Sequence, residues 1–204
     1  AFVDILTEGK GVIGGTMLPP PEGLWGMPGD TLAELPGYDA DVVKRREEAR
    51  AIMKRLGYGP DNRLAVMVTT RNIPGYRDPA VILISQLKEI YIDADLLPID
   101  TAQWYPTLTR KDFKIAMNVT ETATDDPDVA FYENYACGSQ RNYTAYCNPE
   151  VDKLIDKQSV ETNVEKRKKI IWEIEKKLIE DDVRPILFYN KMANCRHRQL
   201  KGLT

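Results

Sequence analysis

The sequence predicts an α/β fold in which a mixed sheet is flanked by helices. Short apolar segments of strand length alternate along the chain with longer segments whose apolar residues recur at helical spacing. Most of the helical segments follow a side chain of the kind that commonly caps helices. The composition agrees, because 204 residues with 43% hydrophobic and 29% charged residues are typical of a globular protein that buries a core without needing a disulfide or a metal.

The first 38 residues are predicted to hold little regular structure. Ala1–Leu6 resembles the middle of a helix, which indicates that the chain is part of a longer one. Residues 9–38 are dominated by glycine and proline and predict an extended, turn-rich crossover segment. Because this segment is also apolar, we expect it to pack along the body of the protein. Its large apolar residues are Met17, Leu18, Leu24, Trp25 and Met27.

Residues 39–119 are predicted to hold three helices and three strands. Asp39 or Asp41 can cap a helix that Gly57 ends in the left-handed conformation. Asp78-Pro79 opens a second helix to about Ile92, and Asp100 with Gln103 resembles a capping box for a third, to about Thr109. The predicted strands are Leu64–Thr69, Asp95–Ile99 and Phe113–Val119.

The remainder of the chain is predicted to add two helices and a final strand. Asn148-Pro149 opens one helix. Thr162 with Glu165 forms a capping box for a longer one, to about Glu180, in which basic and acidic residues alternate as on a solvated face. The final strand is Arg184–Tyr189.

Charge and hydropathy exclude two broad classes. The 28 Lys and Arg residues nearly offset 31 Asp and Glu residues, for a net charge of −3, whereas a protein that tracks nucleic-acid phosphates is normally far more basic. The longest apolar run, Ala80–Ile84, is much too short for a membrane span. Asp4 and Glu8 stand where a signal peptide would carry basic residues.

The three cysteines allow two interpretations. Cys137 and Cys147 are close in a polar stretch, which suits a disulfide in an oxidising compartment and would leave Cys195 single. Three reduced, unrelated thiols fit the spacing equally well. A zinc site is not expected, since His197 is the only histidine and no Cys-x-x-Cys pair is present.

Two loops are candidates for ligand binding. In open α/β sheets, ligands bind at the carboxyl ends of the strands, and this rule selects the loops Thr70–Arg77 and Thr120–Asp128. Arg71 in the first can hold a carboxylate with two hydrogen bonds, or can be a solvated loop charge. The second loop offers hydroxyls, main-chain groups and carboxylates.

Catalysis finds little support in the sequence. Asp125, Asp126 and Asp128 could bind a metal or act as acid and base, but Asp-Pro-Asp equally ends a strand and caps a helix. The chain lacks a Gly-x-Ser-x-Gly elbow, a dinucleotide fingerprint and a phosphate loop. We therefore expect no metal and no cofactor.

Several segments, taken in order, resemble a known family. The chain is similar to the C-terminal part of the extracellular solute-binding proteins of bacterial ABC importers, in the peptide/nickel group that includes dipeptide- and oligopeptide-binding proteins. The resemblance is carried by Glu48–Tyr58, Gln86–Ile92, Asp125–Asp128, Tyr146–Ile155, the long helix after it and Arg184–Tyr189.

The resemblance implies a non-enzymatic binding lobe of a two-lobed, periplasmic-binding-protein-like fold. Residues 1–38 would be the crossover from a missing N-terminal lobe, and residues 39–204 a truncated C-terminal lobe. The protein would be a periplasmic monomer that captures a peptide-like or other small solute and delivers it to membrane permease subunits. A small hydrolase or lyase using Glu121, Asp125 or Asp126 is the alternative, and a free-standing interaction module is a third possibility.

The resemblance also implies roles for single residues. Arg71 matches an arginine that meets a ligand carboxylate, whereas Ala123 stands where an aspartate would hold a peptide's α-amino group. A free ammonium would find no partner at Ala123. The expected ligand-binding residues are Arg71, Asn72, Tyr76, Thr120, Glu121, Thr122, Ala123 and Asp125.

Overall fold

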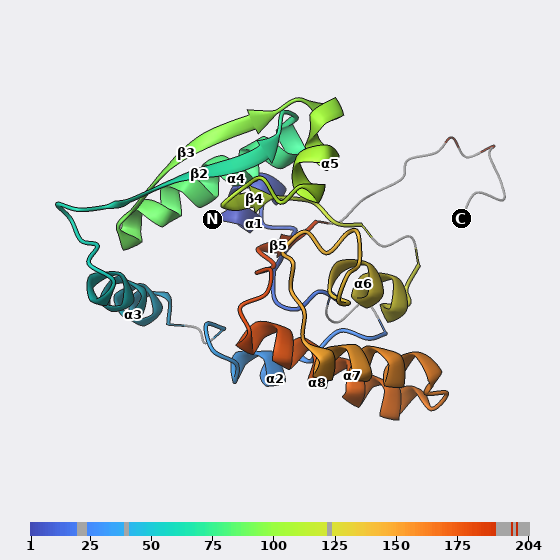
Figure 1. Ribbon diagram of the computed structural model, residues 1–204. Helices are drawn as coiled ribbons and strands as arrows, with labels where there is room; N and C mark the ends of the chain where they lie inside the picture. The colour runs from blue at the N-terminus through green and yellow to red at the C-terminus, as the bar shows by residue number, and fades with distance from the viewer. Residues whose placement is uncertain (20–23, 39–40, 122–123, 191–196, 198, 200–204) are drawn as a thin grey trace.

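The protein is built from a parallel sheet with its helices and a separate bundle of helices, with the N-terminal segment running between them (Figure 1). The computed structural model describes residues 1–19, 24–38, 41–121, 124–190, 197 and 199. Helices flank a parallel sheet, so the predicted α/β class is confirmed. None of the helices in these ranges is long and apolar enough to cross a membrane.

The sheet has the strand order β3-β2-β4, and every pairing in it is parallel. Its strands are β2 (Leu64–Arg71), β3 (Ile92–Ile99) and β4 (Ile115–Met117). The crossovers are α4 (Pro74–Leu87) with the 3₁₀ turn η1 (Lys88–Ile90), then α5 (Thr101–Thr109). A core of Val68, Ala80, Ala94 and Met117 joins α4 to the sheet. Because the strands are parallel, β2 and β4 end at the same edge.

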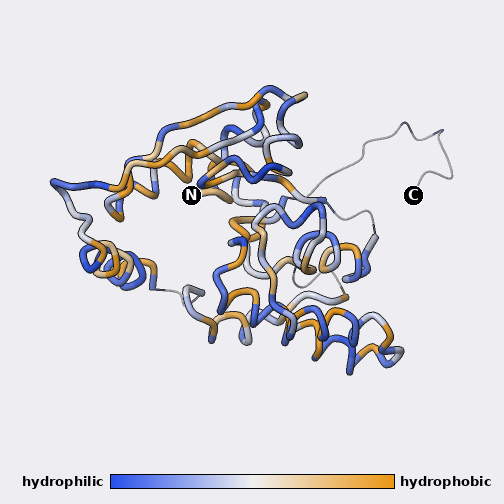
Figure 2. The backbone as a smooth tube through the Cα atoms, in the orientation of Figure 1, coloured by the Kyte–Doolittle hydropathy of each residue, from blue (hydrophilic) through white to orange (hydrophobic). Residues whose placement is uncertain are grey.

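The helical bundle forms the second core. It consists of α6 (Pro127–Asn134), α7 (Pro149–Val160) and α8 (Val164–Glu180). The largest fully buried side chains of this core are Phe131, Ile155, Ile171 and Ile174. In Figure 2 the hydrophobic positions of α7 and α8 alternate with hydrophilic ones, as expected for helices buried on one face.

Five further elements complete the described chain. They are α1 (Phe2–Thr7), β1 (Val12–Ile13), α2 (Gly29–Ala33), α3 (Val42–Arg55) and β5 (Phe188–Tyr189). Strand β1 pairs antiparallel with β5. The parallel and antiparallel pairings of the predicted mixed sheet therefore fall in two separate sheets.

Most of the predicted helix ends are confirmed, and three are wrong. The second helix does not extend to Ile92, because α4 ends at Leu87 and Ile92 is the first residue of β3. Asp41, Asp100 and Asn148 cap their helices through side-chain hydrogen bonds. However, α4 begins at Pro74, because a proline also fits the first turn there and leaves Pro79 inside the helix. Asn163 rather than Thr162 caps α8, since its side chain accepts from the main-chain nitrogen of Lys166 at 3.0 Å.

The crossover segment is anchored to the body by several hydrogen bonds. Tyr189 donates its hydroxyl to the carbonyl of Thr16. Within the segment, Tyr38 donates its hydroxyl to the Gly15 carbonyl oxygen at 3.0 Å. The Leu18 amide donates to a carboxylate oxygen of Glu175 at 2.9 Å. A side chain at Gly14 would place its Cβ 2.0 Å from the Ile186 carbonyl oxygen, so only glycine fits there. The predicted packing of this segment is confirmed, although Leu24 is exposed and α2 adds a short helix.

Glu175 makes the stability of this anchor depend on pH. The side chain is 1% exposed, and its Oε2 has no hydrogen-bond partner in the described part of the chain. Desolvation raises the pKa of Glu175 from 4.5 to about 8, against the smaller opposing effect of the Leu18 amide. The folded protein therefore holds a proton that the unfolded chain releases above pH 4.5.

The expected consequence is a loss of stability as pH rises from 4.5 to about 8. The slope from this group is at most about 1.4 kcal/mol per pH unit. Glu175→Gln keeps an acceptor for the Leu18 amide but cannot ionise. The free energy of unfolding of this variant, relative to that of the wild type, should therefore increase between pH 5 and pH 8. Urea unfolding at pH 5, 6.5 and 8 measures this difference. Parallel pH profiles for the two proteins would contradict it.

Candidate functional site

A polar pocket of about 330 Å³ lies at the sheet edge where β2 and β4 end. Its walls come from the ends of these strands, from α4, α5 and α6, and from the loop between α6 and α7. The lining residues are Arg71, Tyr76, Tyr105, Asn118, Val119, Thr120, Glu121, Glu133, Asn134, Arg141 and Tyr143. Two guanidinium groups, two carboxylates and three phenols thus surround one space, which suits a small solute that carries charge.

Arg71 is the cation on the sheet side of the pocket. It is the last residue of β2, and its Nε donates to Thr101 Oγ1 at 3.2 Å. The guanidinium lies 5.6 Å from the ring centre of Tyr76, whose ring packs edge-on against buried Trp104. Arg71 forms no ion pair with any carboxylate of the described residues. Its charge is therefore held in place by neutral groups.

Arg141 is the second cation, and it is paired. Its Nη1 lies 3.0 Å from Glu133 Oε2 on α6. Burial raises the pKa of both Tyr76 and Tyr143 in the pocket lining, so these phenols stay protonated hydrogen-bond donors at neutral pH. The carbonyl oxygen of the Asn118 side chain is buried and has no partner within the described chain.

Arg184 does not line the pocket, but it forms hydrogen bonds to two residues that do. Its guanidinium donates to the Asn134 side-chain oxygen on α6 and to Thr120 Oγ1 after β4. The main chain of Arg184 has a φ of 85°, an unfavourable conformation for a residue with a side chain. These bonds fix the spacing between the end of β4 and the end of α6.

The structure brings four of the expected binding residues together and leaves others apart. Arg71, Tyr76, Thr120 and Glu121 all line the pocket. Asn72 and Asp125 are described but do not line it, and Thr122 and Ala123 lie outside the described residues, as does Cys195.

Sequence reasoning missed the residues that approach the pocket from other elements. Tyr105, Glu133, Arg141 and Tyr143 are not in the two loops that the strand-end rule selects. A signal existed for two of them, because Arg141 and Tyr143 lie between Cys137 and Cys147. The structure joins these cysteines in a disulfide, which confirms the first interpretation of the cysteines.

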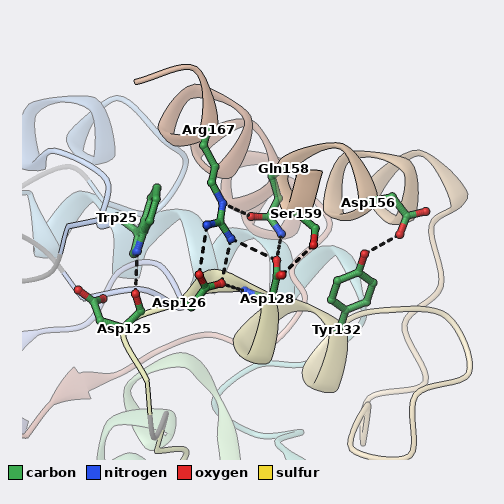
Figure 3. A network of polar contacts seen from close by, with 9 residues as sticks. All are labelled: Trp25, Asp125, Asp126, Asp128, Tyr132, Asp156, Gln158, Ser159 and Arg167. Atoms are coloured by element: carbon green, nitrogen blue, oxygen red, sulfur yellow. Dashed lines mark hydrogen bonds and ion pairs between the residues drawn. The ribbon is translucent and has the colours of Figure 1, made fainter. Parts of the chain in front are cut away.

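The aspartates after β4 serve the fold (Figure 3). Both oxygens of Asp126 accept from Arg167, at 3.1 and 2.9 Å, and Asp126 also caps α6 through the Asp128 amide. Asp128 accepts from Arg167 and Ser159, and the Arg167 guanidinium lies 4.7 Å from the Trp25 ring centre. The hydrogen bonds from Arg167 hold the pKa of Asp126 below its usual value. The predicted capping role is confirmed for Asp126, and the bonds to Ser159 and Arg167 additionally join the start of α6 to α7 and α8.

Asp125 takes part in this network through its main chain. Its carbonyl oxygen accepts from Trp25 Nε1 at 2.9 Å, and its side chain points away from Arg167 in Figure 3. Within the described ranges, no three His, Cys, Asp or Glu side chains are grouped as metal ligands.

Several solved structures of substrate-binding proteins share this fold. Haemophilus influenzae OppA in complex with RPPGFSPFR is 20% identical, with a TM-score of 0.78 over 92% of this chain. The Escherichia coli murein tripeptide binding protein MppA is 16% identical, with a TM-score of 0.78 over 92% of this chain. Staphylococcus aureus NikA in complex with Ni(L-His)2 is 21% identical, with a TM-score of 0.71 over 89%.

This likeness defines the fold as one lobe of a periplasmic-binding-protein-like structure. The chain spans only 36% of OppA, 36% of MppA and 37% of NikA. Neither the protein-family models nor the curated protein sequences yield a match.

The role of Arg167 can be tested by its effect on stability. Arg167→Ala leaves Asp126 and Asp128 without their cation, and losing hydrogen bonds to a charged group should destabilise the fold by about 2 kcal/mol. Lys168→Ala is the matched control, since Lys168 pairs only with the exposed Glu165 on the same helix, and its loss should cost roughly 0.5 kcal/mol or less. Urea unfolding measures both values, and equal stability of the two variants would contradict the assignment.

Proposed function

We propose that this chain is the C-terminal, ligand-binding lobe of a solute-binding component of an ABC import system. The lobe captures a small extracellular solute that bears a carboxylate, and the complete protein delivers it to membrane permease subunits. The observation that carries the proposal is Arg71, a cation at the carboxyl edge of a parallel sheet that faces a polar pocket and has no carboxylate partner in the described chain.

The ligand class follows from the absence of a carboxylate partner for Arg71 among the described residues. A guanidinium whose Nε is bound to Thr101 still offers its remaining N–H groups to a planar anion. A carboxylate fits that geometry with two parallel hydrogen bonds. Tyr76 and Tyr105 then flank the bound anion with their hydroxyls and ring faces. Peptides with a free carboxyl terminus belong to this class, as do other small organic acids.

The fold and the coverage support a two-lobed protein. This chain matches only 36% of OppA and 37% of NikA, so it corresponds to one part of each of these longer proteins. A pocket walled by one lobe leaves a ligand partly in water, and closure of a second lobe would complete its desolvation. We infer a division at residue 38, with the crossover segment leading from the other lobe.

Non-enzymatic binding fits the pocket better than hydrolysis. The lining residues include no cysteine, serine or histidine. Asp126, one carboxylate of the alternative hydrolase, is bound by Arg167, and the Asp125 side chain lies off the pocket wall. The disulfide is consistent with a periplasmic monomer, because such bridges persist in oxidising compartments.

The proposal predicts a specific effect of Arg71. The probe is N-acetyl-alanyl-alanine, which carries a carboxylate and no free amine, and alanyl-alanine amide is the reverse case. In the two-lobed protein, Arg71→Ala should weaken binding of the first probe by tenfold or more, since a charge-assisted hydrogen bond is worth roughly 1.5 to 3 kcal/mol. Isothermal titration calorimetry measures both affinities.

Arg77→Ala is the matched control for this test. Arg77 lies one turn into α4, is exposed and does not line the pocket. Its loss should leave the affinity for N-acetyl-alanyl-alanine within twofold. Equal losses in the two variants, or a stronger preference of the wild type for alanyl-alanine amide, would exclude Arg71 as the carboxylate site.

A further inference from the structure

The loop between the bridged cysteines supplies part of the pocket wall and belongs to no helix or strand. Arg141 and Tyr143 line the pocket from the middle of the segment Cys137–Cys147. The disulfide brings the two ends of this segment together, with Cα atoms 4.6 Å apart. Neither cysteine belongs to the two buried apolar clusters of the described residues. The bridge therefore closes a loop at the pocket and does not fill a core.

Asn142 closes the same loop from inside. Its side chain is buried and donates to the carbonyl oxygens of Ala136 at 3.1 Å and Tyr146 at 2.6 Å. Its own side-chain oxygen accepts from the Tyr146 amide at 3.2 Å. Ala136 and Tyr146 each lie next to one of the cysteines, so the bridge and Asn142 hold the same two arms of the loop.

The conformation of the loop needs such ties. Gly138 and Ala145 are both in the left-handed conformation, with φ of 76° and 58°. Glycine adopts it freely, whereas at Ala145 the side chain makes it unfavourable. The loop is also attached to α7, because the Cys137 amide donates to Asp152 Oδ1 at 3.1 Å. Without the bridge, the Asn142 side chain would provide the side-chain hydrogen bonds that join the two arms directly.

We propose that the Cys137–Cys147 bridge is a positioning element of the binding pocket: it holds the loop from which Arg141 and Tyr143 face the bound solute. The inference rests on the proposed function and extends it, because it places a second cation, opposite Arg71, in the recognition of the same ligand. Arg141 is paired with Glu133, so a ligand group that reaches it meets an acceptor and a donor together. The bridge sets how far this pair lies from Arg71.

The first experiment needs no ligand. Cys137→Ser with Cys147→Ser removes the bridge, and hydrogen–deuterium exchange then reports the amides of residues 139–146. Exchange there should be at least tenfold faster than in the wild type, while exchange in α8 should not change. Tyr146→Phe is the matched control, since it removes only the hydroxyl bond to Asp181 on the outer side of the loop. Unchanged exchange in the loop, or faster exchange throughout the protein, would overturn the proposal.

The second experiment tests whether the bridge acts through Arg141. In the two-lobed protein, we expect the double serine variant and Arg141→Ala each to weaken binding of N-acetyl-alanyl-alanine by about tenfold. In the combined variant, the loss of affinity should be at most about twice the loss seen in either variant alone. A hundredfold loss would mean that the two effects are independent and would overturn the proposal.

The two experiments separate this inference from the proposed function. If the wild-type protein binds neither dialanine probe, the carboxylate-binding function fails, and the exchange measurement alone decides whether the bridge positions the loop. If the wild type binds and the exchange result is negative, only the positioning role fails.

Discussion

The position of the pocket depends on the guanidinium of Arg167. This one group on α8 binds both oxygens of Asp126, reaches Asp128 and lies over the ring of Trp25. Asp126 is the cap of α6, so the bonds fix where the chain leaving β4 enters that helix. The far end of α6 carries Glu133 and Asn134 into the pocket wall. The parallel sheet alone would place the strand ends, but it could not place the opposite wall.

The contrast between the arginines gives the pocket its chemistry. Arg63, Arg141 and Arg167 each lie within 3.0 Å of a carboxylate, at Asp93, Glu133 and Asp126. Arg71 is held only by a hydroxyl and an aromatic ring. Placing a charge in a concave site without its counter-ion costs free energy that a bound anion can return. A carboxylate ligand therefore gains from an arrangement that is already built, because neither Arg71 nor its neighbours need to exchange partners.

Local chemistry made most of the fold predictable, and non-local chemistry decided the rest. Asp100 and Asn148 cap helices through atoms two residues away, so the sequence itself contains the whole interaction. Asp78-Pro79 has the local sequence of a helix start, but α4 begins at Pro74 after Ile73, which provides no capping side chain, so propensity alone did not predict this start. The pairing of β1 with β5 joins residues 12 and 189, for which no sequence signal exists. For the same reason, the strand-end rule found Arg71 and Thr120 but missed Tyr105 and Arg141, whose approach depends on how α5 and the disulfide loop pack.

The pocket and the crossover segment are linked by a short stretch of main chain. Arg184 holds Thr120 and Asn134 behind the pocket. Three residues on, the Leu187 carbonyl accepts from the Gly14 amide at 3.0 Å, and the Ile186 carbonyl fills the space where a side chain of Gly14 would lie. The bond from the Leu18 amide to Glu175 and the bond from the Tyr38 hydroxyl to Gly15 hold the next residues of the N-terminal segment. One short stretch of main chain therefore anchors both residues 14–18 and the two pocket residues Thr120 and Asn134.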